Sequence, residues 1–265
     1  MGTARIRVID EYNIAVPNAP VYFDLGEETQ VVKKTDRDGY VTFTADAGRH
    51  MVGCLIPNNE WLPAKREMIV SPGTETSIAL RLIRYPMLEG SFEVTRMTFE
   101  EIEAAGIDLS DPENQHMLQV NVHLTYGKEE INTSFLYNES TGISINRPCV
   151  ITVGSEQRKT TCYGYKITKP DDPEQYEMAV AILDLPVEAT ALKEFFDVKL
   201  HIINNAASDF VMENNTVTLK VPEGLTIMNA EGYASGAAVS IPSIPCQSQK
   251  TVSWMVRGMK WVNTN

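Results

Sequence analysis

The sequence predicts an all-β protein made of tandem β-sandwich modules with one short helix. Apolar and polar residues alternate with a period of two in many short runs, and turn-forming residues separate these runs. One such turn, within residues 35–43 (TDRDGYVTF), stands between two alternating runs. A convincing helix start occurs at one place, around Thr98. Together these observations favour packed antiparallel sheets over any helical architecture.

The first predicted module covers residues 1–86 and contains about seven short strands. Residues 29–35 and 40–45 are two of them, with the turn Asp36–Gly39 between. Gly39 supplies the positive φ that a tight hairpin turn requires, so we expect these two strands to fold back on each other. Seven short strands at this spacing are typical of a β-sandwich.

The predicted helix follows the first strand of the next segment. Thr98 and Glu101 fit a capping box, and Met97 with Ile102 fits the hydrophobic staple beside it. Gly106 is a natural stop at the C-terminal end. A helix of about two turns is unstable alone, so we expect tertiary packing to hold it.

The middle of the chain reads as strands and turns. Residues 118–126 alternate as a half-buried strand, and residues 149–153 and 159–163 flank a turn-rich pentapeptide. If the latter two runs pair symmetrically, Cys149 stands opposite Cys162. A cross-strand disulfide between them and a pair of buried free thiols are both open interpretations.

The last third contains clear strands at residues 196–202, 217–221 and 252–256. In the first of these the even-numbered residues are apolar and share one face, so Lys199 and His201 are expected on a polar, exposed face. No closing strand is evident after residue 256. Either the sequence is a piece of a longer protein or an earlier strand fills the gap.

We therefore divide the chain into three parts. Residues 1–86 form the first sandwich, and residues 87–189 form a β-rich middle module in which 127–186 is a possible insertion. Residues 190–265 form a last sandwich, completed by strands from residues 92–126, because neither segment alone has enough strands to close one.

Composition and charge exclude some classes of binding partner. The chain has 265 residues, is 43% hydrophobic and carries a formal charge of −12, which disfavours nucleic acid and anionic membrane surfaces. No apolar run approaches the ~20 residues of a membrane span, so no membrane insertion is expected. The N-terminus lacks the apolar stretch of a secretory signal, and a strand pattern begins at residue 3, as in a segment of a longer protein.

Catalytic and metal-binding motifs are not found in the sequence, and we predict no catalytic, cofactor or metal residues. The loop that starts at Asp36 has Val41 and Ala47 where a calcium loop needs its glycine and its bidentate glutamate, so a plain turn is favoured. A second acidic loop could bind a metal but is favoured as a solvated turn; it contains Asp108, Asp111, Glu113 and His116.

Three further features bear on partners and crosslinks. Trp61 lies in a predicted loop and is the candidate partner contact, with a loop plug as the alternative, whereas Trp254 fits a core strand. Trp261 is the third tryptophan. An intramolecular isopeptide bond between Lys199 and a nearby Asn204 or Asn214 is one interpretation of this strand. An exposed lysine on the outer face is the commoner one.

Two segments resemble known families. Residues 3–83 resemble the carboxypeptidase-regulatory-like (transthyretin-like) family, on residues 18–21 (NAPV) and 35–43. Residues 192–257 resemble the Ig-like repeats of large bacterial surface proteins, on three runs: 196–205 (FDVKLHIINN), 217–225 (VTLKVPEGL) and 253–258 (SWMVRG). The whole series is similar to tandem segments in very long proteins of Gram-positive gut bacteria. The resemblance implies an extracellular, modular, non-catalytic role.

We expect a structural or adhesive segment of a bacterial surface or secreted protein, which spaces a distal region or binds an unknown protein or glycan ligand. One alternative is an accessory binding module of a secreted carbohydrate-active or proteolytic enzyme, which the same fold permits. The other is a subunit of a phage or injection-tail assembly. Flanking sequence distinguishes the three.

Overall fold

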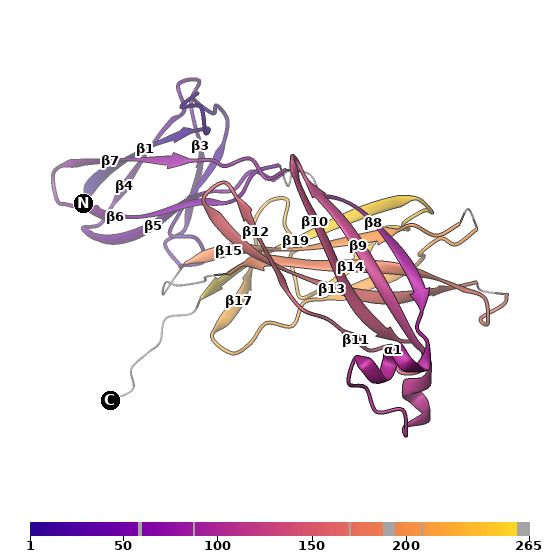
Figure 1. Cartoon of the computed structure of the whole chain (residues 1–265). Coiled ribbons are helices and arrows are strands. Elements are labelled where there is room, and N and C mark those ends of the chain that lie inside the picture. Colours follow the sequence, from indigo (N-terminus) through magenta and orange to yellow (C-terminus); the bar gives the residue numbers. More distant parts are fainter. Residues whose placement is uncertain (58–59, 87, 170, 188–193, 208, 259–265) are drawn as a thin grey trace.

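The computed structural model describes residues 1–57, 60–86, 88–169, 171–187, 194–207 and 209–258, and these form strands β1–β19, one α-helix and one 3-10 helix (Figure 1). The all-β fold is therefore confirmed. Figure 1 shows β1–β7 grouped at one end of the molecule and α1 at the opposite end.

The first module is a two-layer sandwich of seven strands. Its strands are β1 (Gly2–Ile9), β2 (Pro20–Phe23), β3 (Val31–Lys34), β4 (Tyr40–Ala45), β5 (Gly48–Cys54), β6 (Ala64–Val70) and β7 (Glu75–Arg81). One sheet has the order β4-β1-β7 and the other β3-β2-β5-β6. Alternate residues of β1, namely Ala4, Ile6 and Val8, are fully buried between the sheets, as the period-two pattern predicts.

The predicted hairpin across Asp36–Gly39 is wrong. Strand β3 pairs with β2 and β4 pairs with β1, so the turn carries the chain from one sheet to the other. Buried Thr35 fixes this path, because its hydroxyl donates to Val16 O at 2.7 Å and accepts from Ala19 N at 2.9 Å. The positive φ predicted for Gly39 is confirmed at 79°.

The rest of the chain forms three sheets. Their longer strands are β8 (Leu88–Arg96), β9 (Met117–Tyr126), β10 (Glu129–Asn138), β12 (Cys149–Val153), β13 (Glu156–Thr168), β14 (Tyr176–Pro186), β15 (Phe195–Asn204) and β19 (Ser248–Gly258). The shorter ones are β11 (Ser144–Ile145), β16 (Asn215–Thr218), β17 (Leu225–Met228) and β18 (Ala238–Ile241). The sheet orders are β11-β10-β9-β8, β12-β13-β14-β15-β19-β17 and β16-β18.

The six-stranded sheet joins the predicted middle and last parts of the chain. Strands β14 and β15 are antiparallel neighbours, with Ala179 opposite Asn204 and Asp184 opposite Lys199. The division predicted near residue 190 thus falls between two hydrogen-bonded strands, although residue 190 itself lies outside the described residues.

The six-stranded sheet is also the central layer of this second body. One face packs against the β8–β11 sheet, where Val120 and Leu124 of β9 meet Val180 and Ile182 of β14. The opposite face packs against β16 and β18 and their loops, in a cluster that contains Trp254.

The helix α1 (Phe99–Ala104) is capped as predicted. Glu101 N donates to Thr98 Oγ1 at 3.3 Å, and Thr98 N donates to Glu101 Oε2 at 2.8 Å. Ile102 is fully buried, and Gly106 follows at φ 77°. The short 3-10 helix η1 (Pro112–Gln115) comes next and begins at the capping residue Asp111.

The two bodies meet through an apolar interface. The outer face of β2 and β5 presses on the end of the six-stranded sheet, so that Tyr22 and Leu55 pack with Phe195 and Met255. Lys65 adds two polar contacts, because its Nζ donates to Phe195 O at 2.6 Å and pairs with Glu194 at 2.9 Å. Strand β2 is consequently buried on both faces.

Gly53 tests this interface, since a Cβ there lies only 2.0 Å from Phe195 Cζ. We expect Gly53→Ala to push the ring out of the interface and to lower the free energy of unfolding by about 1–3 kcal/mol, the usual cost of overpacking. Urea denaturation measures the change. Gly236→Ala is the matched control because nothing lies within 4 Å of its Cβ position. Equal losses in the two variants contradict a tight interface.

Candidate functional site

A cluster of buried ionisable groups lies on the face of the six-stranded sheet that also meets the linker between the two bodies. Its side chains come from β13, β14 and β15: Arg158, Asp184, Asp197, Lys199 and His201. Strand register places them on one face, because Asp184 is opposite Lys199 and alternate residues of β15 point the same way. None of these side chains is more than 5% exposed.

Ion pairs balance the buried charges. Arg158 Nε lies 2.8 Å from Asp184 Oδ1, and Arg158 Nη1 lies 2.9 Å from Asp197 Oδ1. Lys199 Nζ lies 2.9 Å from Asp197 Oδ2. Two cations thus face two carboxylates, which is the arrangement that makes charge burial tolerable. Glu156 adds a carboxylate that is 30% exposed and lies 2.6 Å from Arg158 Nη1.

Tyr85 of the linker closes the cluster. Its hydroxyl donates to Asp184 Oδ2, and its ring stacks parallel to the imidazole of His201 at a centroid distance of 6.2 Å. Lys199 Nζ lies 4.7 Å from the Tyr85 ring centroid and Arg158 Cζ lies 5.6 Å from it, so the ring face meets both cations.

The loop of the first module in turn holds the linker in place. Tyr85 N donates to Glu60 O at 2.7 Å, and Leu62 N donates to Ile83 O at 2.9 Å. The aromatic ring over the charges is therefore carried by a segment that the first module orders.

The environment shifts the titration of the cluster in consistent directions. Burial by itself raises the pKa of Asp197, but the charges of Arg158 and Lys199 outweigh burial and hold this pKa at about 2. The pKa of Asp184 is likewise lowered: burial opposes the shift, and the His201 imidazole, whose Nε2 lies 3.8 Å from Asp184 Oδ2, and the Arg158 charge outweigh burial. Burial lowers the pKa of His201, with Asp184 opposing. The carboxylates are thus ionised and the imidazole neutral near pH 7.

This cluster contains the residue types of an active site but is closed to substrate, because none of the five side chains is more than 5% exposed. Its geometry serves to hold structure together. The prediction that Lys199 and His201 are exposed is wrong, since Tyr85 covers their face of β15. Asn204 lies on the opposite face and donates to Phe210 O and Ile244 O at 3.0 Å, so it does not meet Lys199 for an isopeptide bond.

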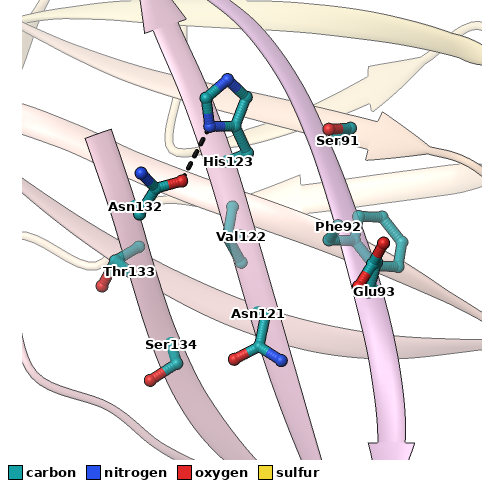
Figure 2. A pocket seen from close by; sticks show the side chains of 9 residues that line it. All are labelled: Ser91, Phe92, Glu93, Asn121, Val122, His123, Asn132, Thr133 and Ser134. Carbon is teal, nitrogen blue, oxygen red and sulfur yellow. Dashed lines mark hydrogen bonds between the residues drawn. The ribbon is translucent and has the colours of Figure 1, made fainter. Parts of the chain in front are cut away.

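An open polar face lies on the other side of the β8–β11 sheet (Figure 2). Outward residues of β8, β9 and β10 line a hollow of about 410 Å³: Ser91, Glu93, Asn121, His123, Asn132 and Ser134. Figure 2 shows His123 turned toward Asn132, and His123 Nδ1 lies 2.8 Å from Asn132 Oδ1. Amide, imidazole, hydroxyl and carboxylate groups offer both donors and acceptors, which suits a ligand rich in hydroxyl groups. We call this surface the polar face.

The tryptophans occupy different environments. Trp61 is half-buried, packs against the core of the first module and lies under Arg84, whose Cζ is 5.1 Å from the ring centroid. Its role as a partner contact stays a prediction. Trp254 is core, as predicted: it is 1% exposed and donates to Gly236 O at 2.9 Å. Trp261 lies outside the described residues.

The predicted opposition of Cys149 and Cys162 is wrong. The turn between β12 and β13 has two residues, Gly154 and Ser155, so the register places Cys149 opposite Thr160. Both cysteines are free thiols in the structure. Burial raises the pKa of Cys162 to about 12, which leaves it an unreactive thiol at neutral pH.

The acidic loops make local turns. Asp36 Oδ1 accepts from Asp38 N at 2.9 Å and from Tyr40 N at 2.8 Å, and Asp111 caps η1. Asp108 Oδ1 accepts from Ser110 N at 2.9 Å. In the described part of the chain, no group of three or more His, Cys, Asp or Glu side chains is arranged to hold a metal ion, and no helix is long and apolar enough to cross a bilayer.

No family model and no curated protein matches the chain. Among solved structures it is similar to a DUF3823 family protein from Parabacteroides merdae, at 8% identity over 93% of this chain and 98% of that chain, with a TM-score of 0.27. A Bacteroides uniformis protein to which carbohydrate binding is ascribed is similar at 9% identity over 92% of this chain and 98% of that chain, with a TM-score of 0.27. It is also similar to BcpA, the major pilin subunit of Bacillus cereus, at 10% identity over 100% of this chain and 93% of that chain, with a TM-score of 0.30. Similarity this low carries no function to this chain, so the function is argued from its geometry.

The buried imidazole generates a pH prediction. The pKa of His201 is lower in the folded state than its unfolded value of about 6.5, so acidification favours the unfolded state, which binds the proton more readily. We expect stability to be full above pH 6.5 and to fall as the pH drops toward 5. In His201→Gln this part of the pH dependence disappears, as measured by urea midpoints between pH 7.5 and 5.

Exposed His116 provides the control, since His116→Gln should leave the wild-type pH slope intact. The Asp184 and Asp197 carboxyls titrate below this window and do not contribute to it. An unchanged slope in His201→Gln argues against a buried neutral imidazole.

Proposed function

We propose that this chain is a non-catalytic segment of a large bacterial surface or secreted protein, which acts as a stiff arm and presents a ligand-binding face. The observation that carries this proposal is the sealed cluster of Tyr85 over Arg158 and Lys199. It places five ionisable side chains out of reach of substrate, at the junction of the two β-sandwich bodies.

Stiffness is supported by contacts of three kinds between the bodies. Tyr22 and Phe195 belong to one apolar cluster, Lys65 pairs with Glu194, and Arg257 donates to Gly26 O at 2.9 Å. Inter-domain interfaces that are small and polar permit motion, whereas an apolar interface reinforced by buried charge resists it. A fixed angle between bodies suits a spacer that holds a distal region away from a surface.

For the ligand, we propose a glycan bound on the polar face. The hollow offers hydroxyl, amide, imidazole and carboxylate groups from three neighbouring strands, which form a rigid platform. Its volume of about 410 Å³ lies within the ordinary range of small-ligand sites. The chain's charge of −12 favours neutral over anionic ligands.

For the first module, we propose membership of the carboxypeptidase-regulatory-like group that residues 3–83 resemble. Seven strands in two sheets, with β1 and β7 parallel, support this assignment. An extracellular location belongs to the same proposal.

A neutral-glycan array followed by titration calorimetry tests the proposed ligand. We expect saturable binding of at least one glycan by the wild-type chain, and at least a tenfold weaker affinity for the double variant His123→Ala with Asn132→Ala. Both side chains are on the outer face of the sheet, so the variant should keep the fold. No product should form from the bound glycan.

The control is Arg37→Ala, a substitution in the first module at a side chain that is 92% exposed, and it should bind as the wild type does. Binding by the wild type that the double variant retains in full contradicts the polar face as the site. Turnover of the glycan contradicts the non-catalytic assignment.

A further inference from the structure

Strand β16 has a free edge. Leu219 N donates to Ala237 O, which continues the β16–β18 pairing, so the backbone groups of Asn215 and Val217 point toward β18. In an antiparallel ladder the intervening residues point the other way. The N–H and C=O groups of Thr216 and Thr218 therefore face a side where no described strand pairs with β16.

A groove of about 480 Å³ runs beside that edge. Its floor is the apolar face of β14 and β15, and includes Ala181, Leu183, Leu200 and Ile202. Tyr163 and Tyr165 form the far wall and are 37% and 52% exposed. In a closed sandwich a further strand covers such a floor, whereas here β16 and β18 cover only part of it.

Two lysines mark one end of the groove. Lys220 lines it directly. Lys159 is exposed and lies on the same face of β13 as Tyr163, four residues earlier and opposite Leu185. Leu219 packs in one cluster with Leu183 and Leu185, which places Lys220 at this same end. A pair of cations here stands out in a chain whose net charge is −12.

We infer that the groove binds one extended segment of a partner protein, which adds to β16 as an edge strand. Its backbone pairs with Thr216 and Thr218, and alternate apolar side chains lie on the floor between Leu183 and Tyr165. An acidic residue lies at the Lys159 and Lys220 end. Main-chain pairing supplies affinity in this mode, and alternate side chains supply specificity. A free backbone edge beside an apolar floor favours a peptide over a glycan, which lacks the matching amide ladder.

The probe is a fluorescein-labelled peptide of sequence DVTVTVTV, whose acidic residue and alternating valines fit this description. Fluorescence anisotropy should show saturable binding to the full chain. The double variant Tyr163→Ser with Tyr165→Ser should bind at least tenfold more weakly, while Tyr12→Ser, at a 76% exposed tyrosine of the first module, should match the wild type. A peptide with proline at its fifth position, which lies opposite Thr216, should bind at least tenfold more weakly, because proline lacks the amide donor.

A charge swap tests the orientation. Lys220→Glu should weaken binding of DVTVTVTV several-fold and should strengthen binding of KVTVTVTV relative to the wild type. Absence of saturable peptide binding, or equal binding by the tyrosine double variant, overturns the inference. Loss of array glycan binding in that variant, with peptide binding intact, also overturns it.

The outcome is separable from that of the proposed glycan site. The variant His123→Ala with Asn132→Ala should bind the peptide as the wild type does, because the polar face lies on a different sheet.

Discussion

The rest of the structure depends on the contact of Tyr85 with the buried charged side chains of β13, β14 and β15. Arg158, Lys199 and two aspartates are fully desolvated, and such charges are tolerated only when each has partners in good geometry. Tyr85 supplies a hydroxyl to Asp184 and an aromatic face to both cations. Because Tyr85 belongs to the linker, the second body completes its core only when the first module is docked.

That dependence gives the molecule a division of roles. The buried ionisable side chains lie at the junction between the two bodies. The outward surfaces carry hydroxyl, amide and imidazole groups on the β8–β11 sheet and a free strand edge at β16. In the proposed function, a rigid junction keeps these two surfaces at fixed positions relative to the first module. Binding on either surface then needs no rearrangement of the scaffold, which lowers its entropic cost.

The sequence predicted what depends on local pattern. Alternation identified the strands of the first module, and the Thr98–Glu101 capping box located the helix. Pairing between distant strands was not predictable, because a turn such as Asp36–Gly39 has the same residues whether it closes a hairpin or crosses between sheets. Burial of Lys199 and His201 was not predicted for the same reason. A polar face of a strand is expected to be exposed to solvent unless the residue that covers it, here Tyr85, is known. Charges at alternate positions of β15 opposite Asp184 were the available signal.

Urea unfolding of Arg158→Met tests the central claim most directly, because the substitution keeps side-chain volume and removes one cation of the cluster. Breaking a buried ion pair leaves a carboxylate unpaired and costs about 3–5 kcal/mol. The account predicts a loss of this size, while Arg37→Met, at a side chain that is 92% exposed, loses almost nothing. A loss below about 1 kcal/mol for Arg158→Met, the level of an exposed ion pair, contradicts a structural role for the cluster.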